Sequence, residues 1–76
     1  MASMDPHERL RELERLGEAY YDAMYDARNP TADYASAKDA FRDAIALAHE
    51  FGETTTVERL QARLAHIKAV FRSQFS

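Results

Sequence analysis

Three histidines, His7, His49 and His66, are the residues best suited to bind a metal ion, because cysteine is absent. A zinc site on a helix commonly places two histidines four residues apart, and no two of these histidines have that spacing. A single histidine beside an acid, as in His49 with Glu50, would hold zinc only adventitiously. We therefore expect three exposed, titrating histidines, no metal site and no cofactor.

Acidic residues are numerous enough to form catalytic pairs, since the chain has thirteen aspartates and glutamates. Glu8 with Glu12, and Asp22 with Asp26, have the four-residue spacing that places side chains on one face of a helix. General acid–base chemistry also needs a pocket that shifts a pKa, and a chain this small has little volume for one. Neither a Ser/His/Asp arrangement nor a glycine-rich phosphate loop can be drawn. We expect a protein that is not an enzyme, with no catalytic residues and no small-molecule substrate.

Basic residues near the end of the chain indicate a different chemistry. Arg59, Arg63 and His66 recur at helical spacing and would form one stripe, as on a helix that reads a DNA groove. The net charge of the chain is −3, and the acidic segments before residue 52 would repel phosphates. Ion pairs between these arginines and the acidic segments would explain the basic stripe without nucleic-acid binding. A small nucleic-acid-binding regulator that uses the basic third helix is therefore the alternative function, and not the leading one.

Tyrosines are frequent anchors at protein interfaces, and the chain has four. We place Tyr20 in the core stripe of the first helix, whereas Tyr21 and Tyr25 lie one turn apart on its flank. A tyrosine on a flank can equally be the edge of a core with a solvated hydroxyl. The two interpretations are compatible, so both flanking tyrosines are candidates for partner binding.

Small residues form a strip in the third helix, at Ala62, Ala65 and Ala69, while Val70 lies on the arginine side. Helix propensity explains such a strip, although it could also receive a helix from a partner or from a second copy. Exposed apolar surface around Val70 and Phe75 would favour the second interpretation. The candidate partner-binding residues are Tyr21, Tyr25, Arg59, Arg63 and Val70.

The elements that must position these residues are helices. The first is expected over residues 5–28, where Asp5 can cap it, Pro6 suits its first position and Glu8 has capping-box spacing. Gly17 interrupts its apolar stripe at a cost of about 1 kcal/mol relative to alanine, which we interpret as room for a close neighbour. The stripe comprises Leu10, Leu13, Leu16, Tyr20, Met24 and Ala27.

Two more helices are expected over residues 31–51 and 55–75. The second stops at Gly52, which suits the left-handed residue after a last turn. The third begins at Thr55, with Glu58 at capping-box spacing, although a neighbouring threonine is a rival cap. The apolar seams are Tyr34, Ala37, Phe41, Ala44, Ala48 and Phe51 in the second helix, and Val57, Leu60, Leu64, Ile67 and Phe71 in the third.

Three amphipathic helices joined by short turns predict one domain, residues 1–76, with residues 1–4 disordered or a cloning remnant. Short connections make sequential helices antiparallel, so the expected fold is all-α, an antiparallel up-down-up three-helix bundle. Alanines of the second helix should let the helix axes approach closely. The first two helices are acidic and the third is basic, which favours assembly, although an exposed ion pair contributes only ~0–1 kcal/mol.

The segment "DYASAKDAFRDAIALA" resembles the second helix of a tetratricopeptide repeat, with Tyr34, Ala37, Phe41 and Ala44 at the family's positions. "LERLGEAYY" is similar to the first helix of that repeat. The first helix and its loop are about eight residues too long for the ~34-residue repeat, and no second repeat follows. In outline the chain is also similar to a microtubule-interacting-and-transport (MIT) domain, a three-helix bundle. Both resemblances imply a non-enzymatic module that binds peptides or helices in grooves between its helices.

We therefore expect a non-catalytic helical protein–protein interaction module that binds a partner helix or peptide in an inter-helix groove. Self-association, as a homodimer, is one form that this binding could take. No segment approaches the roughly 20 apolar residues of a membrane span, and no basic region followed by an apolar run indicates a secretory signal. The expected location is cytoplasmic, without a membrane partner.

Overall fold

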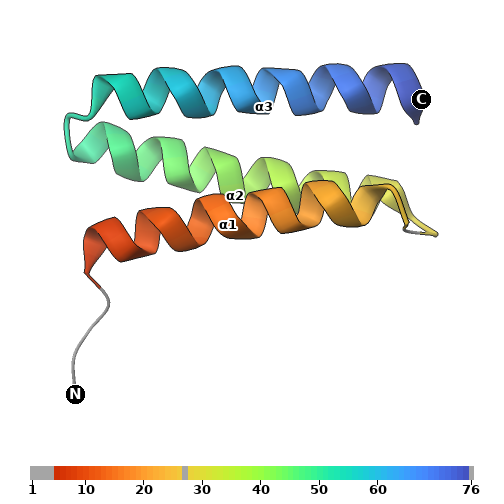
Figure 1. The fold of residues 1–76 in the computed structure, drawn as a ribbon, viewed down its shortest axis with the longest axis horizontal. Coiled ribbons are helices and arrows are strands. Elements are labelled where there is room, and N and C mark those ends of the chain that lie inside the picture. The colour runs from red at the N-terminus through yellow and green to blue at the C-terminus, as the bar shows by residue number, and fades with distance from the viewer. Residues whose placement is uncertain (1–4, 27, 76) are drawn as a thin grey trace.

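Three α-helices make up the fold in the computed structural model, which describes residues 5–26 and 28–75 (Figure 1). α1 spans Pro6–Met24, α2 spans Pro30–Glu50 and α3 spans Thr54–Gln74. α1 packs against α2, and α2 packs against α3, so the chain runs up, down and up. The expected all-α three-helix bundle is confirmed. The expectations for residues 1–4 and for Ala27 lie outside the described residues.

The ends of α1 are set by local hydrogen bonds. A carboxylate oxygen of Asp5 accepts a 2.8 Å hydrogen bond from the His7 amide, as expected for a capping residue. At the other end α1 stops at Met24, four residues before the expected end. There the amides of Tyr25 and Asp26 bond to carbonyls three residues back, which tightens the last turn and lets the chain leave the helix.

The turn between α2 and α3 is made by Gly52, whose φ of 71° is the left-handed conformation expected of it. The cap expected at Thr55 is wrong, because α3 already begins at Thr54 with Glu53 as its N-cap. No side chain caps this end, and the Val57 amide bonds instead to the Glu53 carbonyl at 3.0 Å. The chain therefore enters α3 one residue earlier than the threonine pattern indicates.

Gly17 of α1 lies in close contact with Phe41 of α2. A Cβ atom added there would lie 2.6 Å and 2.7 Å from two ring carbons of Phe41, which is fully buried. Ala37, Ala44 and Ala48 of α2 are also fully buried, as the apolar seam of α2 predicted. The interpretation of Gly17 as room for a close neighbour is confirmed.

The rotation of α1 differs from the expected one. Tyr21 is only 8% exposed and belongs to the core, whereas Tyr20 is 38% exposed. The buried stripe passes through Gly17 instead of Leu16, because α1 turns its smallest residue toward the Phe41 ring. The stripe through Leu16 and Tyr20 is consequently rotated toward solvent, and the predicted roles of the two adjacent tyrosines are exchanged.

A single hydrophobic core joins the three helices. Its largest fully buried side chains are Phe41, Met24, Leu60 and Ile67, which come from all three elements. Because the core is shared, the side chains of α1 and α3 are held in a defined relative position. None of the helices that the structure describes combines the length and the apolarity needed to cross a membrane.

Candidate interaction surface

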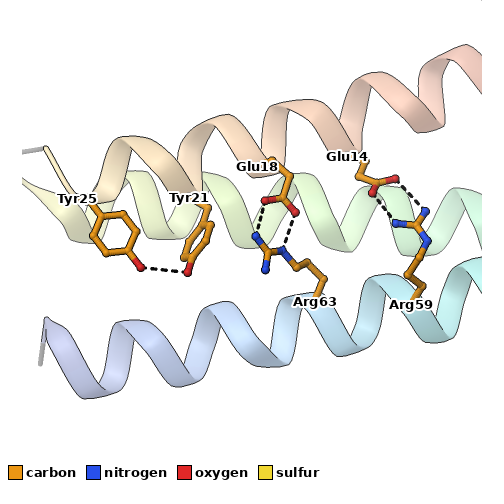
Figure 2. A network of polar contacts seen from close by, with 6 residues as sticks. All are labelled: Glu14, Glu18, Tyr21, Tyr25, Arg59 and Arg63. Atoms are coloured by element: carbon orange, nitrogen blue, oxygen red, sulfur yellow. Dashed lines mark hydrogen bonds and ion pairs between the residues drawn. The ribbon is translucent and has the colours of Figure 1, made fainter.

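α1 and α3 flank α2 and meet each other mainly through long side chains, as Figure 2 shows. Arg59 of α3 donates two hydrogen bonds to the carboxylate of Glu14 on α1, at 2.6 Å and 3.0 Å. Arg63 donates two to Glu18, both at 2.7 Å. Two-point pairs of this kind fix both the distance and the orientation of the guanidinium group. We call the surface that carries them, together with Tyr21 and Tyr25, the α1–α3 face.

The register of the α1–α3 face is constant along the helices. Both ion pairs join residues 45 positions apart, as two parallel helices of equal rise require. The same offset links Tyr21 to His66, whose rings lie 6.4 Å apart in an edge contact. Continuing the offset places Val70 level with Tyr25. The face therefore consists of matched levels of α1 and α3.

The ion pairs change the titration of their members. The hydrogen bond from Arg59 lowers the pKa of Glu14 below its usual value, against the opposing effect of partial burial. The same bond raises the pKa of Arg59, and the bond to Glu18 raises that of Arg63. Both side chains of each pair remain partly exposed, so each pair contributes at most about 1 kcal/mol to stability.

Aromatic rings continue the face toward the end where α1 stops. Tyr25 contacts Tyr21 edge-on at 5.6 Å between ring centroids and Phe75 at 5.8 Å. Phe75 in turn lies 5.7 Å from Phe71, which stacks on Tyr34 of α2 at 3.9 Å. These contacts form a continuous series of five rings, which we call the aromatic row. In order along the series, its members are Tyr21, Tyr25, Phe75, Phe71 and Tyr34.

A cation lies at each end of the aromatic row. The Arg63 guanidinium lies 5.0 Å from the centroid of the Tyr21 ring, and the Lys38 ammonium lies 4.5 Å from that of Tyr34. Both distances suit attraction between a cation and a ring face. Arg63 therefore connects the ion pairs with the aromatic row.

Tyr25 is the most exposed member of the row among the described residues, with 49% of its surface accessible. Its hydroxyl lies 3.1 Å from that of Tyr21, so one hydroxyl donates to the other (Figure 2). This bond, with the burial of the ring, raises the pKa of Tyr21 above its usual value. The buried Tyr21 thus holds Tyr25 in place through this hydroxyl contact, while the ring of Tyr25 remains half exposed to solvent.

The structure brings four of the five predicted site residues together on the α1–α3 face, namely Tyr21, Tyr25, Arg59 and Arg63. Val70 is half-buried against the core, as is Phe75, so neither forms the exposed apolar surface considered from the sequence. Glu14 and Glu18, which also belong to this surface, were not predicted from the sequence. Their four-residue spacing, identical to that of Arg59 and Arg63, was the signal that could have found them.

The remaining candidates for chemistry lie elsewhere. His7 stacks on Phe51 at 4.5 Å, and its Nε2 lies 2.9 Å from a carboxylate oxygen of Glu53. Within residues 5–26 and 28–75, no three acidic or histidine side chains are grouped as metal ligands would be. A hollow of about 120 Å³ at the α2–α3 turn is lined in part by His49 and Val57, and a larger one of about 270 Å³ is lined by residues of α1 and α2, including Arg9 and Asp43. Both are smaller than the roughly 300–1,000 Å³ of ligand pockets.

Comparison of the chain with protein-family models, with curated proteins and with solved structures finds no match. The class that the fold defines is therefore a small three-helix domain, and its function has to be inferred from its surface. The α1–α3 face carries both the matched ion pairs and the most exposed described tyrosine. For these two reasons the α1–α3 face is the candidate interaction surface.

Proposed function

We propose that the protein is a non-catalytic helical interaction module, and that its α1–α3 face binds a helix or an extended peptide. The observation that carries the proposal is the state of Tyr25, which is half exposed yet held by a hydroxyl contact to Tyr21 and a ring contact to Phe75. Tyrosine is enriched among residues that dominate binding energy. A side chain already held in place loses less conformational entropy when a partner binds.

The ion pairs add direction to this surface. Carboxylates line its α1 edge and guanidinium groups line its α3 edge. A bound segment is therefore oriented when its basic residues lie along the α1 edge and its acidic residues lie along the α3 edge. Such charges set orientation and association rate more than affinity. The aromatic row supplies the apolar contact area at one end.

Several further observations support an interaction module over an enzyme. The hollows at the α2–α3 turn and between α1 and α2 are both smaller than usual ligand pockets, and the three histidines are exposed, two of them in contact with aromatic rings. The likeness to tetratricopeptide and MIT helices points to the same kind of activity. A cytoplasmic location remains part of the proposal.

The alternative, a nucleic-acid-binding regulator that uses α3, is supported less well. Arg59 and Arg63 are its main cations, and each already bonds to a glutamate of α1. Phosphate binding would have to compete with those carboxylates, which would also repel the phosphate. No other observation favours this function.

Capture of partners from the source cells tests the proposal, with Tyr25→Ala compared to wild type and to Tyr20→Ala. Tyr20 is the matched control, because it is also an exposed tyrosine of α1 but lies outside the α1–α3 face. We expect a partner whose affinity falls at least about tenfold in Tyr25→Ala, the size of effect that an interface tyrosine gives. The Tyr20→Ala protein should bind as wild type does.

The proposal is wrong if the captured partner binds the Tyr25→Ala protein normally and loses affinity for the Tyr20→Ala protein. Circular dichroism of both variants establishes that helicity is unchanged. Urea denaturation of both variants separates a loss of stability from a loss of binding, because Tyr25 also contacts Tyr21 and Phe75.

A further inference from the structure

The α1–α3 face is divided by charge along its length. Glu14 and Glu18 form its α1 edge, and Arg59 and Arg63 form its α3 edge (Figure 2). The two edges run parallel and at matched levels, since both pairs have the same separation in the sequence. A surface with this pattern has opposite charge on its two sides at both levels that carry an ion pair.

Each charged group has unused hydrogen-bonding capacity. A guanidinium group has five N–H donors, and Arg59 and Arg63 each use two of theirs on α1. A carboxylate accepts at about four lone-pair positions, and Glu14 and Glu18 each use two. The side chains of Arg59 and Arg63 are 56% and 38% exposed, so a second set of partners can reach them. The face can therefore form charge-assisted bonds outward without losing those it already has.

A surface of this kind is complementary to itself in one orientation. When two copies stack face to face around a two-fold axis parallel to the helices, α1 of each copy lies over α3 of the other. Glutamates then oppose arginines at both of the charged levels, because these levels already match within one chain. When the axis is perpendicular to the helices, α1 lies over α1 and like charges oppose each other, which is unfavourable.

The aromatic end of the face fits the same orientation. Tyr25 lies level with Val70 and its ring reaches Phe75 at the end of α3, so the parallel axis brings Tyr25 of each copy to the level of Val70 of the other, close to Phe75. Apolar area would be buried at this end, while the ion pairs set the orientation at the other. An isologous contact uses the same patch on both subunits, as this one does.

From this charge pattern we infer that the partner of the α1–α3 face is a second copy of this chain, stacked face to face with α1 of each copy over α3 of the other. The inference rests on the proposed function, because it names the occupant of the same face. The contact is small and largely polar, so the dimer is weak and reversible and its affinity falls as salt increases.

A fourfold charge exchange tests the inference. The variant carries Glu14→Arg, Glu18→Arg, Arg59→Glu and Arg63→Glu, which preserves the ion pairs within one chain and should leave the fold intact. In a dimer of two variant chains opposite charges again meet. In a mixed dimer with the wild-type chain, arginine meets arginine and glutamate meets glutamate.

The measurement is sedimentation velocity of each purified protein over a range of concentrations, followed by titration of a fluorescently labelled wild-type chain with either unlabelled protein. We expect the two homodimers to have dissociation constants within about threefold of each other, as their equal numbers of ion pairs require. We expect the mixed dimer to be at least about tenfold weaker than either, because like charges oppose each other at both charged levels.

Three results overturn the inference. A wild-type chain that remains monomeric up to millimolar concentration excludes the dimer, while the proposed function survives if another partner still depends on Tyr25. A mixed dimer as strong as the homodimers shows that the charged edges do not meet between chains. A mixed dimer stronger than both homodimers shows that α1 packs on α1 and that the orientation is wrong.

Discussion

Gly17 determines how α1 is positioned on α2. It lies against the Phe41 ring, at a distance that leaves no room for a side chain. With Gly17 facing α2, Tyr21 is buried one turn further along, and Tyr25 is supported where it reaches solvent. A glycine in the middle of a helix thus contributes to the geometry of a surface two turns away.

Gly17→Ala should lower the free energy of unfolding. The added Cβ overpacks against Phe41 at a cost of about 1–3 kcal/mol, and the gain in helix propensity of about 1 kcal/mol offsets only part of it. We expect a net loss of about 1 kcal/mol, measured by urea denaturation.

The same substitution in a Phe41→Leu background is the control. With the aromatic ring removed, Gly17→Ala should increase stability relative to the Phe41→Leu protein, because helix propensity then acts alone. If Gly17→Ala stabilised the wild-type chain as well, contact with Phe41 would not be the reason for the glycine.

The exchanged roles of Tyr20 and Tyr21 show the limit of sequence reasoning at the residue scale. Both tyrosines fit a three- and four-residue spacing with the leucines, so periodicity alone favoured the longer stripe through Leu16. The choice depends on which side of α1 approaches α2, and that is a tertiary contact between Gly17 and Phe41. Local patterns contain no information on that rotation.

At the scale of the elements, α1 and α3 are linked by two matched ion pairs instead of by close contact of their backbones. The opposite charges of these helices were evident in the sequence, as was the stripe of Arg59 and Arg63. Their pairing with Glu14 and Glu18 was not evident in the sequence, because it depends on the axial position of α3 relative to α1, and these two helices are not consecutive in the chain. The core that α1 and α3 share with α2 sets this axial position.

The pairing of Glu14 with Arg59 predicts a pH dependence of stability. The folded-state pKa of Glu14 lies below its unfolded value, so the pair stabilises the fold at pH above the unfolded value of about 4.3. That contribution is lost as the pH falls through the lowered, folded-state pKa. The difference in unfolding free energy between wild type and Arg59→Gln should therefore be largest at neutral pH and should shrink in acid.

Urea denaturation at pH 7 and near pH 3 measures this difference, and carboxyl NMR titration should show a higher pKa for Glu14 in the Arg59→Gln protein. Arg42→Gln, at an exposed arginine of α2, is the matched control and should leave the Glu14 titration unchanged. An unchanged Glu14 pKa in Arg59→Gln would show that the pair does not persist in solution.

Across the whole molecule, the sequence predicted the number, order and direction of the helices correctly. Caps, prolines, Gly52 and the apolar seams are local signals, and short turns leave few ways to connect three helices. The candidate surface was predicted only in part. Arg59, Arg63 and Tyr25 were found by residue type and spacing, whereas Glu14 and Glu18 became members only when α1 and α3 were placed side by side.

The account as a whole assigns function to one face of a small bundle. Photo-crosslinking in the source cells tests that assignment most directly, with p-benzoylphenylalanine placed at Tyr25 in one protein and at Tyr20 in another. Both positions are exposed on α1, but only Tyr25 belongs to the α1–α3 face. We predict covalent adducts from position 25, including one of twice the mass of the chain, and none from position 20. Adducts from position 20 with none from position 25 would contradict the account.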